Sequence, residues 1–117
     1  MLSEAFAAPT SDLECLRYVA YKEARGEPIK AVNAVITTVK NRSVIFNKSI
    51  CEVASQKGAF PYFKKNFKFV KDKKFLHKFE LANNISNVLD DEYLYFNTTK
   101  FSWGRNCKKF GKLIFCK

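Results

Sequence analysis

The sequence has no apolar run long enough to cross a bilayer. Lysine, arginine, aspartate or asparagine interrupts every hydrophobic segment before the roughly 18 residues that a membrane span needs. It also lacks metal-binding spacing, since its four cysteines form no C-x-x-C pair and its single histidine, His77, stands apart from them. We therefore predict no transmembrane segment, no metal and no cofactor.

Acidic residues are scarce. Eleven Asp and Glu stand against 21 Lys and Arg, which gives a net charge of +10. Such an excess favours a polyanionic partner, either nucleic acid, an anionic envelope polymer or a membrane surface. Charge alone does not choose among the three.

The length and the aromatic content predict one folded domain. The chain has 117 residues, of which 47% are hydrophobic and 15% aromatic, a composition that excludes a disordered chain. It contains no internal repeat and no long linker. We assign residues 11–117 to the domain and residues 1–10 to a flexible tail, in which Ala5-Phe6-Ala7 resembles a signal-peptidase site but no complete signal peptide precedes it.

The four cysteines allow three pairings. Cys107 and Cys116 flank a predicted hairpin around Gly111, so a bridge between them is sterically reasonable, and Cys15 could then pair with Cys51. Free buried thiols are the alternative. Two disulfides would place the working protein outside the reducing cytosol.

Local signals predict a mainly helical α+β domain with a small β-hairpin element. Ser11 with Glu14, and Ser49 with Glu52, have the capping-box spacing that begins a helix. Apolar residues then recur at helical spacing. The expected helices run from Ser11 to Gly26, from Pro28 to about Arg42, from Ser49 to about Gln56, and from Asp72 to near Asp90; the expected strands are Tyr93–Phe96 and a hairpin ending at Leu113–Phe115.

A group of short motifs spans most of the chain. Glu23-Ala24-Arg25-Gly26-Glu27-Pro28 ends the first helix, and the second helix leads to Asn41-Arg42. Then follow Gln56-Lys57-Gly58-Ala59-Phe60, Tyr95-Phe96-Asn97 and the stretch from Gly111 to Phe115. In this order the motifs resemble the cell wall hydrolase family typified by the spore-cortex-lytic enzyme SleB. One departure is Gly111-Lys112-Leu113-Ile114-Phe115, where family members commonly have Gly-x-His-x-Phe.

The resemblance implies a lysozyme-like, lytic transglycosylase-type fold. It also implies cleavage of peptidoglycan glycan strands at the β-1,4 bond between N-acetylmuramic acid and N-acetylglucosamine. Such cleavage needs a carboxylic acid to protonate the leaving oxygen, and the family's catalytic glutamate corresponds to Glu23. Glu27 is the alternative acid, or a structural or substrate-orienting residue. The resemblance places the remaining substrate-binding residues at Gln56, Phe60, Tyr95, Phe96 and Asn97.

The motifs offer one acid and no second carboxylate in a clear nucleophile position. This favours a lytic transglycosylase, in which one glutamate serves first as acid and then as base, although hydrolysis stays open. The small size is similar to that of a phage endolysin. We expect a monomer that acts at the bacterial cell wall or in the periplasm, with its basic surface against the anionic envelope.

Two other functions are open from the sequence. Residues 63–79 interleave seven lysines with phenylalanines, as a nucleic-acid-binding module would to contact phosphates and stack on bases. We expect no nucleic-acid partner, because the phenylalanines fall at core spacing and arginine, the better base reader, is scarce. The domain could also be an inactive relative that binds glycan.

Overall fold

The computed structural model describes residues 11–56, 59–63, 67–98 and 104–117. The predicted tail, residues 1–10, lies outside these ranges. The predicted mainly helical α+β class is confirmed. The elements in chain order are α1 (Asp12–Ala24), α2 (Ile29–Ile45), α3 (Ile50–Ala54), α5 (Lys73–Asn84), β1 (Tyr95–Asn97), β2 (Lys108–Phe110) and β3 (Leu113–Cys116). No helix in the described part combines the length and the apolar character needed to cross a membrane.

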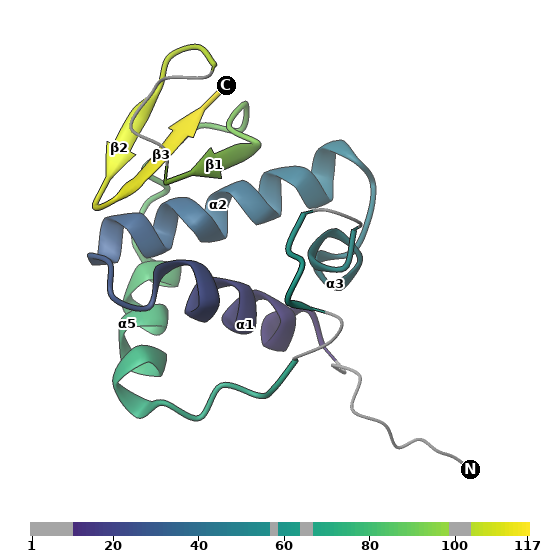
Figure 1. The fold of residues 1–117 in the computed structure, drawn as a ribbon, viewed down its shortest axis with the longest axis vertical. Coiled ribbons are helices and arrows are strands. Elements are labelled where there is room, and N and C mark those ends of the chain that lie inside the picture. Colours follow the sequence, from purple (N-terminus) through teal and green to yellow (C-terminus); the bar gives the residue numbers. More distant parts are fainter. Residues whose placement is uncertain (1–10, 57–58, 64–66, 99–103) are drawn as a thin grey trace.

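Helix α2 forms the centre of the molecule. Figure 1 shows α2 between the sheet on one side and α1 and α5 on the other, with α3 beside its C-terminal half. It contacts α1, α3, α5, β1 and β2. Its aliphatic residues are buried through the middle of the helix, whereas Ile29, Val44 and Ile45 near its ends are exposed. Those at or below 2% exposure are Ala31, Val32, Ala34, Val35, Ile36 and Val39. The predicted core helix is therefore confirmed, and it continues past Arg42 to Ile45.

Both serines predicted to cap helices do so, but of the two predicted capping boxes the one at Ser49 is complete and the one at Ser11 has only the serine's half. The Ser11 hydroxyl accepts a hydrogen bond from the Glu14 backbone N–H at 3.2 Å, while the Glu14 carboxylate pairs with Arg17 at 2.6 Å. At α3 the capping box is complete, since the Ser49 and Glu52 side chains each accept from the other's backbone N–H. These caps satisfy N–H groups that the first turn of a helix leaves without partners.

Helix α5 is shorter than predicted. It ends at Asn84, not near Asp90, and Ile85 has extended backbone angles. The side chain of Asn33, 1% exposed in α2, accounts for the difference. Its amide donates to the Ala82 carbonyl at 2.9 Å, and its oxygen accepts from the Val88 N–H at 2.9 Å. A backbone held this way cannot continue as a helix, and residues 85–92 form an irregular segment.

The C-terminal region folds as a three-stranded antiparallel sheet in the order β1-β3-β2. β2 and β3 form the predicted hairpin, and Gly111 takes the positive φ of 59° that its turn requires. The predicted strand at Tyr93 begins only at Tyr95, where residues 95–97 pair with β3. Tyr93 is instead buried, with its hydroxyl donating to the Asn106 carbonyl.

Both disulfides that the spacing allows are present, and the alternative of free buried thiols is wrong, since no cysteine is free. Cys15–Cys51 joins the start of α1 to α3, and Cys107–Cys116 joins the start of the hairpin to its end. The first spans 36 residues of sequence and the second spans nine.

We predict that the Cys15→Ala/Cys51→Ala pair lowers the free energy of unfolding more than the Cys107→Ala/Cys116→Ala pair. Loop closure in the unfolded chain makes the longer bridge worth about 1 kcal/mol more. Urea unfolding of both variants measures the difference, and an equal or reversed order would contradict the loop-closure argument.

We also predict that Asn33→Ala lowers the free energy of unfolding by about 2–4 kcal/mol, because it leaves a buried carbonyl and an N–H without partners. Urea unfolding monitored by circular dichroism measures the loss. Asn87→Ala, at an exposed position of the same irregular segment, serves as the control with a change below about 0.5 kcal/mol. Equal effects of the two substitutions would refute the role assigned to Asn33.

Candidate active site

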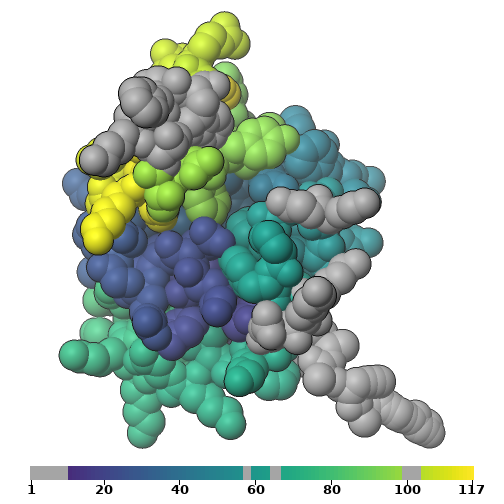
Figure 2. Space-filling view, in the orientation of Figure 1, coloured from purple at the N-terminus to yellow at the C-terminus, as the bar shows by residue number. Residues whose placement is uncertain are grey.

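A cleft of about 640 Å³ opens between the helices and the sheet. Four separate parts of the chain build it, namely the end of α1, the last turns of α2, the segment after α3, and β1. In Figure 2 the purple-to-blue residues of α1 and the following turn, the teal residues after α3 and the green residues around β1 adjoin on the face shown. The lining residues are Glu23, Arg42, Gln56, Ala59, Phe60, Tyr95 and Phe96.

Glu23 lies one residue before the end of α1 and is half-buried. The hydroxyl of Tyr62 donates a hydrogen bond to its Oε2 at 2.7 Å. Burial, then the hydrogen bond to Glu23 and the negative charge of that carboxylate, raise the pKa of Tyr62 well above its ordinary value. Tyr62 therefore stays a phenol and keeps donating, which holds the Glu23 carboxylate in one orientation.

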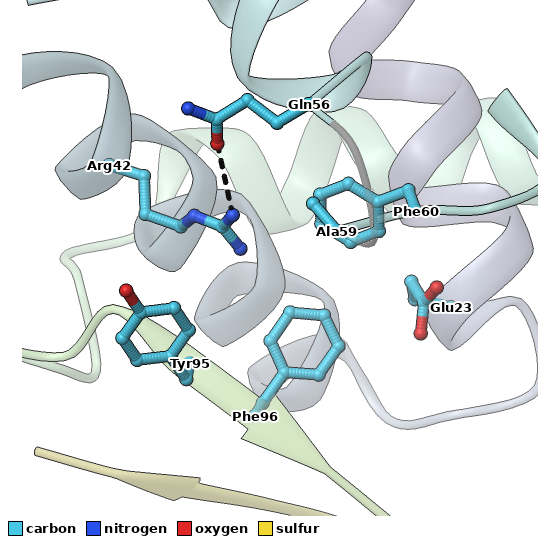
Figure 3. Close-up of a pocket in the computed structure, with 7 residues that line it drawn as sticks. All are labelled: Glu23, Arg42, Gln56, Ala59, Phe60, Tyr95 and Phe96. Carbon is cyan, nitrogen blue, oxygen red and sulfur yellow. Dashed lines mark hydrogen bonds between the residues drawn. The ribbon is translucent and has the colours of Figure 1, made fainter. Parts of the chain in front are cut away.

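Arg42 stands at the other end of the cleft. Figure 3 shows Arg42 and Tyr95 on one side, Glu23 on the other, and the rings of Phe60 and Phe96 between them. The Arg42 guanidinium donates to Gln56 Oε1 at 3.2 Å. It also lies 5.6 Å from the centre of the Phe60 ring and 5.2 Å from that of Tyr95. Burial lowers the pKa of Arg42, and Tyr95 partly offsets this.

Aromatic rings form the walls between the two ends. The rings of Phe60 and Phe96 are 6.4 Å apart, and Phe96 rests on Phe115 of β3 at 5.2 Å. Phe60 is 5% exposed, whereas Tyr95 is 47% exposed at the mouth. Apolar walls with a few polar groups at fixed positions are typical of a ligand cleft.

Five of the seven residues predicted for the site meet in this cleft: Glu23, Gln56, Phe60, Tyr95 and Phe96. Asn97, the next residue of β1, is exposed and accepts a hydrogen bond from the Thr98 N–H at 2.6 Å. It does not belong to the cleft lining.

The structure also places Glu27 outside the cleft lining. Its Oε1 accepts from the Lys112 N–H at 2.9 Å, and its carbonyl accepts from the Lys78 ammonium at 2.9 Å. Glu27 thus joins the end of α1 to the hairpin turn and to α5. The sequence allowed Glu27 to be the acid, a substrate-orienting residue or a structural residue. These contacts fit the structural role.

Sequence reasoning missed Arg42 and Tyr62 as site residues. For Arg42 the sequence carried a signal, since Arg42 continues the aliphatic stripe of a core helix. Burying a cation there costs free energy unless an anion or another polar partner lies close to it. Tyr62 lies next to Phe60 in an aromatic segment and carries no comparable signal. In the described ranges no group of three or more His, Cys, Asp or Glu side chains could hold a metal ion.

Comparison of the chain with family models, with curated proteins and with solved structures found no match.

We predict that phenolate absorbance below about pH 11 is the same in wild type and in Tyr62→Phe, because the raised pKa keeps Tyr62 protonated over that range. In Glu23→Gln, Tyr62 ionises at lower pH than in wild type, since the carboxylate charge that opposes the phenolate is gone. Absorbance titration, with circular dichroism to confirm folding, tests both points. A smaller phenolate signal in Tyr62→Phe below that pH would contradict the prediction.

Proposed function

We propose that this protein has a lysozyme-like fold and cleaves peptidoglycan at the β-1,4 bond between N-acetylmuramic acid and N-acetylglucosamine, with Glu23 as the catalytic acid. One observation carries the proposal. Glu23 lies in the same cleft as Gln56, Phe60, Tyr95 and Phe96, the residues that the resemblance to SleB-type hydrolases marks for substrate binding.

The chemistry needs one proton donor and walls that hold sugar rings. The protonated Glu23 gives its proton to the glycosidic oxygen, and the bond from C1 of the muramyl sugar to that oxygen breaks. The resulting carboxylate takes the proton of the muramyl 6-hydroxyl, whose oxygen then bonds to C1. The product is a 1,6-anhydro sugar, and no water is consumed.

The described carboxylates support a lytic transglycosylase over a two-carboxylate hydrolase. Glycosidases of the usual kind place a second carboxylate across the scissile bond. Among the described lining residues Glu23 is the sole carboxylate, and the Glu27 carboxylate accepts a hydrogen bond from the Lys112 N–H in the hairpin turn. Direct hydrolysis through a bound water is the competing outcome, and the product distinguishes the two.

Charge and covalent structure support action at the cell wall or in the periplasm. Two disulfides suit an oxidising compartment, and a net charge of +10 favours contact with anionic envelope polymers. The protein works as a monomer on glycan strands.

The contacts of residues 63–79 weigh against the nucleic-acid module. Phe63, Phe75 and Phe79 are at most 4% exposed, so their rings are not available for stacking on bases. Among the described phenylalanines of this segment, Phe69 is exposed, at 46%. One exposed ring among the described residues gives a lysine face little to stack on bases, so its contacts to nucleic acid would be mainly to phosphates.

We predict that Glu23→Gln lowers the release of soluble fragments from purified peptidoglycan by a factor of about 100 or more, because general acid catalysis is lost. Circular dichroism should be unchanged. Glu27→Gln, which alters the alternative acid four residues away, should retain most of the activity. Turbidity loss of peptidoglycan suspensions measures all three proteins.

Mass spectrometry of the released fragments identifies the reaction, since the anhydro product is lighter than the hydrolysis product by one water. Equal activity of Glu23→Gln and wild type would refute the assignment of Glu23. Inactivity of the wild type together with tight, salt-dependent DNA binding would favour the nucleic-acid module.

A further inference from the structure

Arg42 is a buried cation that no carboxylate neutralises within the described residues. Its side chain lines the cleft and the residue is 8% exposed. No ion pair involves it among those described, and its Nε has no hydrogen-bond partner. Among the described residues, its side-chain contacts are one hydrogen bond to the neutral Gln56 and the faces of two aromatic rings.

Arg17 provides a comparison within the same protein. Its Nε is also buried without a partner, but its guanidinium meets the Glu14 carboxylate at 2.6 Å and the Glu80 carboxylate at 3.5 Å. The fold thus neutralises this other arginine with acids on the protein. Arg42, which faces the cleft, has no such acid in the part of the chain that the structure describes.

Burying a cation without a partner is unfavourable, and aromatic faces compensate only part of the lost hydration. The guanidinium has five N–H donors arranged as a planar fork that fits a carboxylate through two parallel hydrogen bonds. Gln56 and Tyr95 lie beside Arg42 and help keep that fork directed into the cleft, as Figure 3 shows.

We propose that Arg42 binds a carboxylate carried by the glycan substrate, so that the cleft selects acidic sugar strands over neutral ones. This inference rests on the proposed function, because it places a glycan strand in the cleft with its scissile bond at Glu23. The carboxylate belongs to the lactyl ether of N-acetylmuramic acid where the peptide is absent, or to an acidic residue of the peptide stem where it is present.

The site has consequences for specificity. An uncharged oligomer of N-acetylglucosamine can stack on Phe60, Phe96 and Tyr95 but leaves Arg42 without an anion. A carboxylate-bearing strand fills both ends of the cleft and is held in one register relative to Glu23. Arg42 is thus a specificity-determining residue and takes no part in proton transfer.

The test measures binding by isothermal titration calorimetry to the full chain carrying Glu23→Gln, which prevents turnover. Three ligands of equal glycan length are compared: a neutral N-acetylglucosamine oligomer, an oligomer with free muramyl lactyl carboxylates, and one whose lactyl groups carry an L-alanyl-D-glutamate stem. We expect at least one acidic ligand to bind ten-fold or more tightly than the neutral oligomer, since charge-assisted bidentate hydrogen bonds are strong. If the oligomer with free lactyl groups binds more tightly, the carboxylate is that of the lactyl ether. If the oligomer with the dipeptide stem does so, the carboxylate is that of the peptide.

Adding Arg42→Gln should reduce the preference, taken as the ratio of the acidic-ligand affinity to the neutral-oligomer affinity, to about one-fold. Circular dichroism shows whether this variant is still folded. Arg42→Lys should keep part of the preference, because it retains the charge and loses the planar fork. A preference that persists in Arg42→Gln, or no preference in the Glu23→Gln protein, would overturn the inference. Peptidoglycan cleavage by the wild type, measured separately, shows whether the proposed function stands when the inference fails. Failure of every ligand to bind overturns the inference as well.

Discussion

The shape of the molecule depends on two asparagine side chains that hold an irregular segment against the central helix. Asn33 of α2 binds backbone groups of Ala82 and Val88, and Asn41, two turns further on, donates at 2.9 Å to the carbonyls of both Asp90 and Tyr93. Backbone groups away from water need such partners. Because α2 supplies them, the chain between α5 and β1 lies along that helix without regular structure.

This attachment positions one wall of the cleft. The segment held by Asn41 leads directly into β1, which carries Tyr95 and Phe96. The residue after Asn41 is Arg42, whose side chain points into the cleft between Gln56 and Tyr95. The C-terminal end of α2 therefore binds the segment that leads into the sheet, and it also lines the cleft between the helices and the sheet. Glu23 is held independently, by Tyr62 from the segment after α3.

Several features of the fold were predictable because their causes are local. The caps at Ser11 and Ser49 join each serine to the residue three positions further on, and the turn at Gly111 depends on one residue that tolerates positive φ. In contrast, the end of α5 was predicted too late. Its apolar spacing continues to Leu89, which is indeed buried at 3% exposure, but from an irregular segment. Periodicity indicates burial and does not reveal which backbone groups find partners elsewhere.

For the site, the sequence by itself determined the excess of positive charge. Through the resemblance of its motifs it indicated the candidate acid and the aromatic residues, and it left open whether the four cysteines pair. Only the tertiary structure decided that Glu27 contacts a backbone N–H 85 residues away, that Asn97 lies outside the cleft lining, and that Arg42 faces the cleft without a neutralising acid among the described residues. The physical reason is the same in each case. A side chain's role depends on the charge and hydrogen-bonding groups that folding brings near it, and helical spacing carries no information about partners that come from distant parts of the chain.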